Sequence, residues 1–282
     1  MVRGFGADDA TAWLRAESTE LAAADFVARN AEVFAVFGRA SQASGNVSYG
    51  VRAGRARFFV KTAGSPADEP TSLPHSARVA LLRRAIRLAR AVSDPTLLTL
   101  HNVIESRDGP LLVYEWAEGE LLRAPGASRS LPSSAGARFL GLTLAERSAA
   151  LDSVFRVHVK LAQKGYVACD FYDGSLIYDF AKRRLRVIDL DNYRDGPFVN
   201  QVGRMFGSTR FMAPEELTLG ARIDQRTTVF TLGRTAQQFL AYDGQYSAGV
   251  AALIARACEA APERRFGSVA DFYRAWSGAV AE

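Results

Sequence analysis

The segment 166–193 combines carboxylates with long apolar stretches. Its aspartates include Asp170, Asp173, Asp189 and Asp191, and the segment otherwise reads as two buried strands. Acidic side chains are rarely buried without a partner. One explanation is that these aspartates lie in exposed turns. The other is that they bind a cation, for which magnesium is the best candidate, with a phosphate group behind it.

The composition is that of a folded protein with one large domain or two lobes. The chain has 282 residues and a hydrophobic fraction of 48%, which is ample for a core. Two cysteines cannot form a disulfide framework, and three histidines are too few for a metal cluster. No apolar run is long enough to span a membrane, and the N-terminal residues lack the core of a signal peptide. We therefore expect a cytoplasmic protein that does not bind a membrane.

The charge gives weaker information. The net charge of +5 suits an anionic ligand, although a value of this size is also common in proteins without one. The sequence has no dense tract of lysine and arginine, so we expect no nucleic-acid partner.

The apolar pattern predicts an α+β protein with a β-rich first part and a helical second part. Residues 8–36 predict one or two helices, because their apolar residues recur at helical spacing (Trp13, Leu14, Leu21, Phe26, Val27, Val33 and Phe34). The stretch NVSYGVRAGRARFFVK predicts two strands that turn at Gly54, and LTLHNVIES and LLVYEW predict a second hairpin. Between them, residues 76–93 predict an amphipathic helix with its apolar side inward (Leu81, Leu82, Ile86, Leu88 and Val92).

The second part begins with a segment, 123–139, whose serine, alanine, proline and glycine residues indicate a loop or short-helix insertion. A long helix follows. It opens with a capping box, Thr143 and Glu146, and closes at Gly165. His158 on this helix is predicted to be a packed residue and not a ligand.

Several imperfect motifs occur in the order and at the spacing of the protein-kinase superfamily, and the chain resembles this family over residues 37–276. The resemblance implies a bilobal fold. Its β-rich N-lobe would span 37–116 and its mainly helical C-lobe 117–282, after an N-terminal helical extension, 1–36. The implied activity is transfer of the γ-phosphate of ATP, with Mg²⁺, to a hydroxyl group.

The first motif is FFVKTAG. It places Lys61 at the end of a strand, where the family keeps the lysine that neutralises the α- and β-phosphates of ATP. Upstream, GRASQASGNV stands where the glycine-rich loop is expected. Only Gly45 matches a glycine of that loop, because Ala40 and Gln42 fill the other two positions.

The same loop has two small hydroxyl residues, Ser41 and Ser44, which would still let backbone N–H groups approach a phosphate. Val47 follows it and is a further candidate for contact with the nucleotide. The resemblance therefore implies a phosphate loop that grips ATP less tightly than the usual one.

The stretch LLVYEWAEGELL resembles the hinge that binds adenine in this family. The backbone groups of Glu115 and Ala117 would contact the adenine, and Tyr114 would limit the depth of its pocket. Glu120 would lie near the ribose or the acceptor.

The stretch YVACDFYDGSLIYD resembles the catalytic loop. Asp170 takes the place of the catalytic aspartate, which orients the attacking hydroxyl and accepts its proton. Ser175 stands where the family has a metal-binding asparagine, and a hydroxyl is a poorer magnesium ligand than an amide. Asp173 lies between them, has no counterpart in the family and is an additional candidate ligand.

The stretch RVIDLDNY resembles the magnesium motif of the family, with Asp189 as the metal aspartate. Its Asp-Leu-Asp form is closer to the pattern of kinases that act on antibiotics and choline. Asp191 is therefore a candidate second ligand. Magnesium takes few carboxylates together with phosphate oxygens, which suits this set.

The stretch MFGSTRFMAPEE resembles the end of the activation segment. Glu215 would form a buried ion pair with Arg265. Ser208 stands where kinases of serine and threonine have a residue that contacts the catalytic aspartate. Thr228 stands where an aspartate anchors the catalytic loop.

Three departures from the family pattern affect the function. Ala85 replaces the helix glutamate that pairs with the strand lysine, Cys169 replaces the arginine that binds a phosphorylated activation loop, and Tyr172 replaces a phosphate-binding lysine. Arg204 and Arg210 lie inside the activation segment, so we do not expect them to tie it to the catalytic loop as that arginine does.

Three functions remain open. A serine/threonine protein kinase is favoured by the activation-segment motifs. A small-molecule phosphotransferase is favoured by Asp-Leu-Asp, by the phosphate loop with a single matching glycine, and by Tyr172. A pseudokinase, which binds without transfer, is favoured by Ala85 and Ser175. The sequence predicts ATP and an acceptor hydroxyl as partners in the first two cases, and it does not identify the acceptor.

Overall fold

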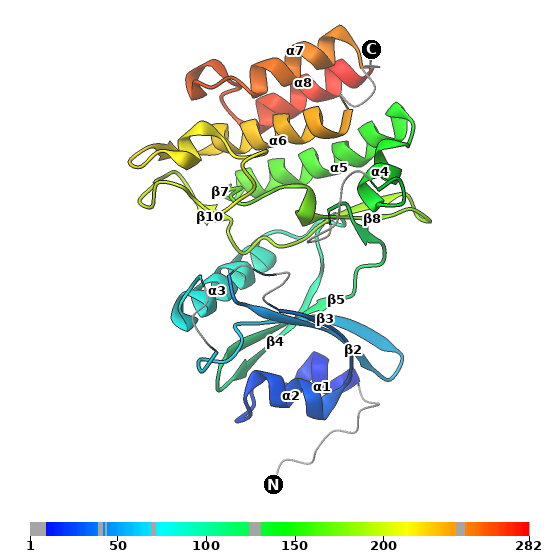
Figure 1. Cartoon of the computed structure of the whole chain (residues 1–282), viewed down its shortest axis with the longest axis vertical. Coiled ribbons are helices and arrows are strands. Elements are labelled where there is room, and N and C mark those ends of the chain that lie inside the picture. Colours follow the sequence, from blue (N-terminus) through cyan, green and yellow to red (C-terminus); the bar gives the residue numbers. More distant parts are fainter. Residues whose placement is uncertain are drawn as a thin grey trace. The chain divides into compact units, whose positions relative to one another are not determined.

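The computed structural model describes residues 10–38, 42, 44–68, 72–123, 131–240 and 246–281. It divides into two compact units: unit 1 is Met1–Ser93 with Leu98–Ala117, and unit 2 is Asp94–Leu97 with Glu118–Glu282. Unit 1 is rich in β-sheet and unit 2 is mainly helical (Figure 1), so the structure is mixed α and β as the sequence predicted.

Unit 1 is built on a five-stranded antiparallel sheet. The strand order is β1-β2-β3-β5-β4, and the strands are β1 (Glu32–Phe37), β2 (Val47–Ala53), β3 (Ala56–Thr62), β4 (Leu100–Ser106) and β5 (Gly109–Glu115). The hairpin β2–β3 turns at Gly54, where φ is 58°, a left-handed conformation that suits glycine. Both predicted hairpins, β2–β3 and β4–β5, are confirmed.

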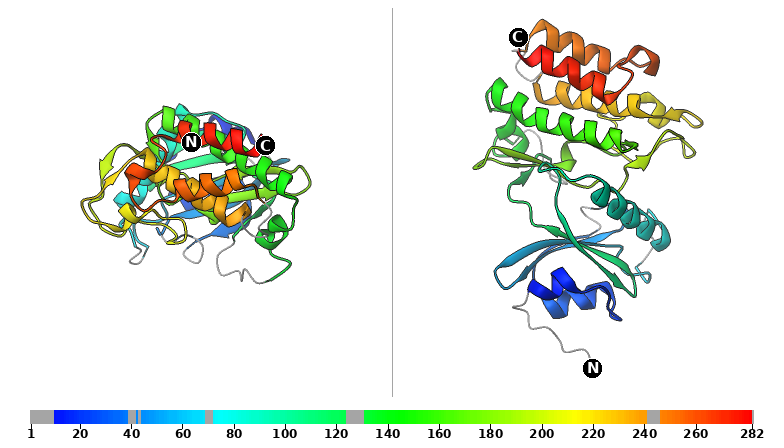
Figure 2. Two further views of the ribbon diagram at one scale, coloured as in Figure 1. Left: turned by 90° about the horizontal axis from the view of Figure 1, so that it is seen from above. Right: turned by 180° about the vertical axis from the view of Figure 1, so that it is seen from behind.

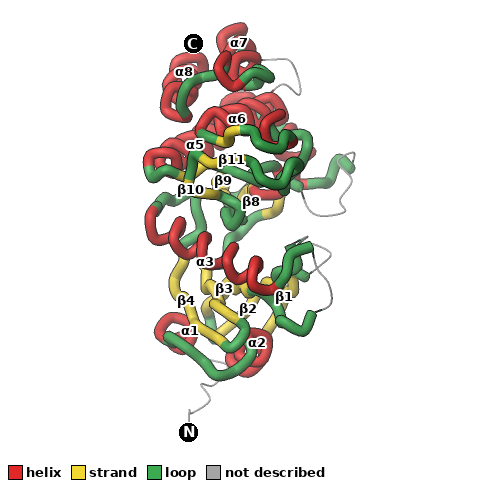
Figure 3. Tube along the Cα trace, turned by 90° about the vertical axis from the view of Figure 1, so that its left-hand side faces the viewer, coloured by secondary structure: helices red, strands yellow, loops and turns green. Residues whose placement is uncertain are grey.

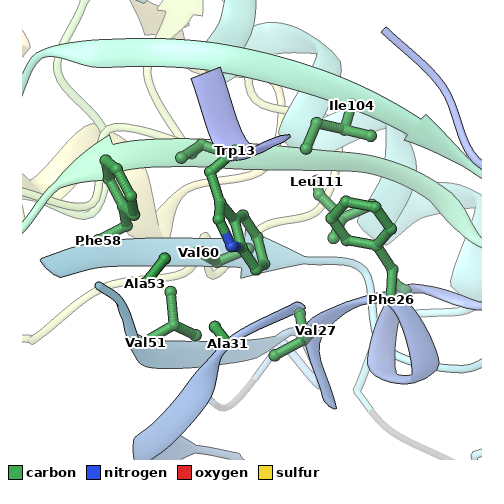
Figure 4. Close-up of a cluster of buried hydrophobic side chains, with 12 residues drawn as sticks. Trp13, Phe26, Val27, Ala31, Val51, Ala53, Phe58, Val60, Ile104 and Leu111 are labelled. Atoms are coloured by element: carbon green, nitrogen blue, oxygen red, sulfur yellow. The ribbon is translucent and has the colours of Figure 1, made fainter. Parts of the chain in front are cut away.

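Helices cover both faces of this sheet. They are α1 (Ala10–Arg15) and α2 (Ala23–Asn30) on one face and α3 (His75–Ala91) on the other. Leu111 of β5 packs in a core with Trp13 and Phe26, while Leu112, the next residue, packs with Leu82 of α3. Successive strand residues point to opposite faces, so each face has its own core; Figure 4 shows the one formed with α1 and α2.

The prediction that residues 8–36 are helical throughout is wrong at its end. The helices stop at Asn30, and Val33 and Phe34 belong to β1, the edge strand of the sheet. Val33 pairs with Val51 of β2, and the Phe34 ring packs against the Trp116 ring with 4.8 Å between their centroids. The sequence EVFAVF is rich in β-branched and aromatic residues, so pairing with β2 outweighs the apparent helical spacing.

Unit 2 is dominated by four helices that pack on one another (Figure 2). They are α5 (Leu144–Gln163), α6 (Gln225–Leu240), α7 (Ala248–Ala257) and α8 (Val269–Ala281), and a shorter α4 (Ala135–Leu140) precedes them. The capping box of α5 is confirmed, because Thr143 Oγ1 accepts from Glu146 N–H while the Glu146 carboxylate accepts from Thr143 N–H. The short helix α4 lies within the predicted insertion, of which residues 124–130 are outside the described part.

Unit 2 also contains short strands, most of which lie in the segment 166–223. The strands are β6 (Glu120–Leu121), β7 (Tyr166–Val167), β8 (Leu176–Asp179), β9 (Arg184–Val187), β10 (Arg194–Asp195), β11 (Phe198–Val199) and β12 (Arg222–Ile223). They form three small sheets, β6-β8-β9, β7-β10 and β11-β12. The chain from β9 to α6 is otherwise loop with one turn of 3-10 helix, Pro214–Leu217 (Figure 3). None of the described helices has the length and hydropathy that a membrane crossing requires.

Candidate active site

Two aspartates of unit 2 share an unusual backbone conformation. Asp170 has φ 59° and Asp189 has φ 61°, and the other non-glycine residue with positive φ in the described part is Arg183. The left-handed region costs an ordinary residue about 1 kcal/mol or more, and such strain collects at functional sites. Each aspartate follows a short strand, β7 and β9 respectively. The two residues that the sequence singled out are therefore held in conformations that the surrounding structure must maintain.

The loop that carries Asp170 lies against residues from three separate segments. Asn192 donates from Nδ2 to Asp170 Oδ2 at 2.9 Å. Thr228 of α6 accepts a hydrogen bond from Ala168 N–H at 3.0 Å, so it anchors the loop before Asp170 as its position in the sequence suggested. Gly207 lies alongside, since a Cβ atom on it would be 3.7 Å from the Asp170 Cα.

A buried brace supports the loop around Asp189. Nδ1 of His158 lies 2.8 Å from Val154 O, and its Nε2 lies 2.7 Å from the Tyr193 hydroxyl. A carbonyl can only accept, so Nδ1 carries the proton and Nε2 accepts from Tyr193. Burial lowers the pKa of His158 to about 4, which keeps the ring neutral at pH 7. The ring also packs on Phe171, so the prediction that His158 is a packed residue is confirmed.

Asp173 forms a bidentate ion pair with Arg210. Its two carboxylate oxygens accept from the guanidinium at 2.8 and 3.2 Å, and only 2% of the Asp173 side chain is exposed. Arg234 of α6 in turn donates to Arg210 O at 2.8 Å. The prediction that Arg210 does not bind a phosphate as the arginine of the family does is not tested by this contact. Arg210 nevertheless ties its own segment to the loop that follows Asp170, through the Asp173 carboxylate.

Cys169 strengthens the same connection through apolar contact. It is buried in a cluster with Met205 and Met212 of the activation segment and with Val167 and Ile223. The family has an arginine at this position to bind a phosphate, so apolar packing occupies a place where charge pairing was expected.

Ser175 has a buried hydroxyl that finds no partner within the described part of the chain. Its Oγ makes no hydrogen bond to any described residue, while its backbone carbonyl accepts from Ile188 N–H at 2.9 Å, directly before Asp189. A buried polar group without a partner costs free energy. A ligand that uses this oxygen would remove the cost, which fits the predicted metal role of Ser175.

The described residues contain no group of three or more His, Cys, Asp or Glu side chains placed to hold a metal ion by themselves. Asp191 is buried, as is Ser175. Magnesium is bound through one or two carboxylates plus phosphate oxygens and water, so a complete protein cage is not needed. Asp189, Ser175 and Asp191 offer oxygen donors, the ligand type that magnesium takes.

Tyr172 presents a neutral phenol close to these carboxylates. Its ring lies close to Gly174, where a Cβ atom would be 2.4 Å from Tyr172 Cε2. Burial, followed by the charges of Asp170 and Asp189, raises the pKa of Tyr172 to about 12. The hydroxyl therefore remains protonated at pH 7 and can donate a hydrogen bond at the position where the family has a charged lysine.

Three of the predicted nucleotide residues, Gly45, Val47 and Lys61, lie at the open end of the β2–β3 hairpin. Lys61 on β3 is buried and pairs in register with Ser48, and the next pair is Thr62 with Val47. Thr62 Oγ1 also donates to Val47 O at 2.7 Å. Gly45 precedes β2 with φ 91°. Ala40 and Ser41, to which the sequence gave roles in the phosphate loop, lie outside the described residues.

Arg78 is the residue of this region that sequence reasoning missed. It lies on α3 and is 2% exposed, and its guanidinium donates to Gly45 O at 2.8 Å, Ala63 O at 2.6 Å and Ser65 O at 3.2 Å. Ala85, where the family has a glutamate, is buried and apolar. The sequence does contain a signal for Arg78. It lies three and four residues before Leu81 and Leu82, so it falls on the buried side of α3.

The predicted hinge residues divide between the units. Glu115 donates its N–H to Thr99 O at 3.0 Å, and its carboxylate accepts from Thr99 N–H at 2.8 Å. Tyr114 and Ala117 flank it at the end of unit 1. Glu120, in unit 2, pairs with Arg138 of α4 at 2.7 Å. The roles of all four residues toward a nucleotide stay predictions.

The predicted ion pair of the activation segment is confirmed. The Glu215 carboxylate accepts from Arg265 at 2.7 and 2.9 Å, and both side chains are buried. Thr227 of α6 donates to the same carboxylate at 2.8 Å. The pair fixes the end of the segment to the helices of unit 2.

The strained aspartates, the buried serine hydroxyl and the Glu215–Arg265 pair all belong to unit 2. No protein-family model matches the sequence. The chain is similar to the serine/threonine-protein kinase pkn2 of Myxococcus xanthus, with 29% identity over 174 residues. That similarity covers 57% of this chain and 19% of the relative. It supports a protein-kinase-like relationship.

Proposed function

We propose that the chain is a phosphotransferase of the protein-kinase type, which transfers the γ-phosphate of ATP to a serine or threonine hydroxyl of a protein. The observation that carries the proposal is the pair Asp170 and Asp189, both in the left-handed conformation at the ends of strands. The similarity to a serine/threonine kinase and the Glu215–Arg265 pair at the end of the activation segment support it.

The residues of unit 1 would bind the nucleotide. Lys61 would neutralise the α- and β-phosphates, and backbone groups at Gly45 and Val47 would lie along them. The carbonyl of Glu115 and the N–H of Ala117 would contact the adenine, with Tyr114 limiting the depth of the pocket.

Asp189, Ser175 and Asp191 would hold the magnesium ion in unit 2. The buried Ser175 hydroxyl supports this, because it has no partner among the described residues. Bound Mg²⁺ neutralises the charge that develops on the transferred phosphate. Asp173 already forms two hydrogen bonds with Arg210, so we assign it to anchoring the activation segment instead.

Asp170 would orient the acceptor hydroxyl and take its proton late in the transfer. The Tyr172 phenol would donate to the transferred phosphate in place of the lysine of the family. A neutral donor stabilises a phosphate less than an ammonium does, so we expect slow transfer.

The test is transfer of labelled phosphate from γ-labelled ATP with Mg²⁺, to the chain itself and to protein acceptors, with the sites mapped by mass spectrometry. The Asp170→Asn variant should lose transfer. The control is Asp152→Asn, which changes a partly exposed aspartate on α5 that pairs with Arg156. Equal transfer by Asp170→Asn and the unmodified protein would contradict the proposal.

A small-molecule phosphotransferase is the second candidate. It is favoured by Asp191, which is buried where the family has glycine, and by Tyr172 in place of the lysine. A screen of aminoglycosides and hydroxylated metabolites as acceptors separates the two, because only this candidate predicts transfer to a small alcohol without transfer to protein.

A pseudokinase is the third candidate, favoured by the apolar Ala85 on α3. It predicts binding of Mg·ATP with no transfer to any acceptor.

A further inference from the structure

We infer that Asn192 is a positioning residue for Asp170, an inference that rests on the proposed function. The side-chain amide of Asn192 donates to Asp170 Oδ2 at 2.9 Å. Hydrogen bonds to a charged carboxylate are among the stronger ones in proteins. This contact therefore restricts rotation of the carboxylate about its Cβ–Cγ bond, which is the motion that would misdirect the group toward an acceptor hydroxyl.

The backbone fixes the approach of the two residues. Strand β7 leads into Asp170, and β10 follows Asn192 along the chain. The two strands pair antiparallel, with Arg194 opposite Val167 and Asp195 opposite Tyr166. Asp170 and Asn192 thus extend from the same end of one two-stranded ladder, so their contact follows from the register and is not a chance surface rotamer.

A second restraint holds Asn192 from the other side. The next residue, Tyr193, donates its backbone N–H to Leu190 O at 3.1 Å and its hydroxyl to the buried ring of His158. The loop between Asp189 and β10 is therefore closed by a turn and tied to α5. Asn192 has little freedom to leave Asp170 while this brace is in place.

The proposed role requires a side chain at position 192 that donates a hydrogen bond to Asp170. An aspartate at position 192 would have nearly the same shape but would place a second negative charge against Asp170. A leucine would fill similar space and donate nothing. The two substitutions remove the donor by different means, which makes them a useful pair.

The experiment compares Asn192→Leu and Asn192→Asp with the unmodified protein in steady-state transfer and in calorimetric binding of Mg·ATP. We expect kcat to fall about 10- to 100-fold, since a catalytic group displaced by about 1 Å loses on the order of 100-fold in rate. The Kd for Mg·ATP should stay within about twofold for Asn192→Leu, because Asn192 does not bind the nucleotide in this scheme.

The control is Asn102→Leu. Asn102 also donates through its side chain, to the carbonyls of Trp13 and Ala16 in unit 1, and has no contact with the aspartates. It should lower the melting temperature without a change in kcat at a temperature where the protein is folded.

A double-substitution cycle tests most directly whether Asn192 acts through Asp170. In an Asp170→Asn background, Asn192→Leu should have no further effect on residual transfer, because the group it orients is gone. Additive effects would overturn the inference, as would an unchanged kcat in Asn192→Leu or a Kd for Mg·ATP that rises in parallel with the loss of kcat.

Two other outcomes are distinguishable. If Asn192→Leu does not fold, Asn192→Asp retains the shape of the side chain, and normal kcat in that variant overturns the inference. Absence of transfer in the unmodified protein would remove the proposed function and this inference with it. Normal transfer by both Asn192 variants would remove this inference alone.

Discussion

Asp170 and Asp189 have the same side chain and nearly the same backbone conformation, yet the proposed reaction gives them different tasks. Asp189→Ala should abolish Mg²⁺-dependent binding of ATP, because it removes the principal metal ligand. Asp170→Ala should keep that binding and lose transfer. Calorimetry with and without EDTA, together with transfer assays, checks both variants. Full transfer by Asp170→Ala, or unchanged metal dependence in Asp189→Ala, would show that the assignment is wrong.

Glu216 gives a prediction for stability against pH. Burial, followed by the charges of Glu215 and Asp170, raises the pKa of Glu216 to about 8 from its ordinary 4.5. Between pH 4.5 and about 8, Glu216 is therefore protonated in the folded state and ionised in the unfolded chain. The contribution to stability is complete below pH 4.5 and is lost as the pH rises to about 8.

The Glu216→Gln variant should remove this dependence. Its amide oxygen can still accept from Ala213 N–H, as the Glu216 carboxylate does at 2.8 Å. We measure the free energy of unfolding with urea at pH 6 and at pH 8.5. Its decrease from the lower to the higher pH should be smaller in the variant than in the unmodified protein. The exposed Glu263→Gln is the control and should leave the difference unchanged; an identical pH dependence in Glu216→Gln would refute the argument.

At the scale of elements, contacts between side chains hold the predicted activation segment in place. Arg210 pairs with Asp173, Cys169 packs with Met205 and Met212, and Glu215 pairs with Arg265. Protein treated with phosphatase should therefore keep its transfer activity. Phosphorylation of Ser208 should inhibit, because it brings negative charge next to the segment of Gly207 that borders Asp170.

The measurement compares initial rates of phosphatase-treated protein, Ser208→Ala, Thr209→Glu and Arg210→Gln. Only Arg210→Gln should lose activity, since it removes the cation that pairs with the buried Asp173 carboxylate, at a cost of about 3–5 kcal/mol. A large loss on dephosphorylation that Thr209→Glu restores would instead indicate control by phosphorylation.

Arg78 gives helix α3 a hydrogen bond to Gly45 of the predicted phosphate loop. The Arg78→Met variant should free Gly45 and the residues after β3, because three carbonyls lose their donor. Hydrogen exchange at residues 44–48 and 63–65 should accelerate, and the Kd for Mg·ATP should rise. Arg83→Met is the matched control, as it removes an exposed ion pair with Glu105 from the same helix. Unchanged exchange in Arg78→Met would contradict this role.

The elements that sequence reasoning predicted correctly are those encoded by local pattern. Helix α3 and the two hairpins follow from apolar periodicity, and the start of α5 from its capping box. β1 was missed because an edge strand depends on its partner β2 more than on its own spacing. The contacts of Asp170 with Asn192 and of Asp173 with Arg210 join loops that are 22 and 37 residues apart, so no local pattern signals them.

On the scale of the whole molecule, the N-terminal helices belong to the fold of unit 1. Trp13 is completely buried, and its indole N–H donates to Asn30 O at 3.0 Å. Trp13→Ala should lower the free energy of unfolding by about 3–5 kcal/mol, as other large-to-small core substitutions do. Its neighbour Leu14 is 45% exposed, so Leu14→Ala should cost under about 1 kcal/mol. Chemical denaturation measures both; similar values for the two variants would show that α1 is not part of the core.

The positions of the three tryptophans give each unit its own optical signal. Trp13 and Trp116 belong to unit 1, and Trp276 belongs to unit 2, where it is buried against Phe155. Indole emission changes when the ring passes from an apolar interior into water. A protein with phenylalanine at positions 13 and 116 would therefore emit from unit 2 alone, and one with phenylalanine at position 276 from unit 1 alone. Fluorescence can then follow, without any added dye, which half of the chain a nucleotide stabilises.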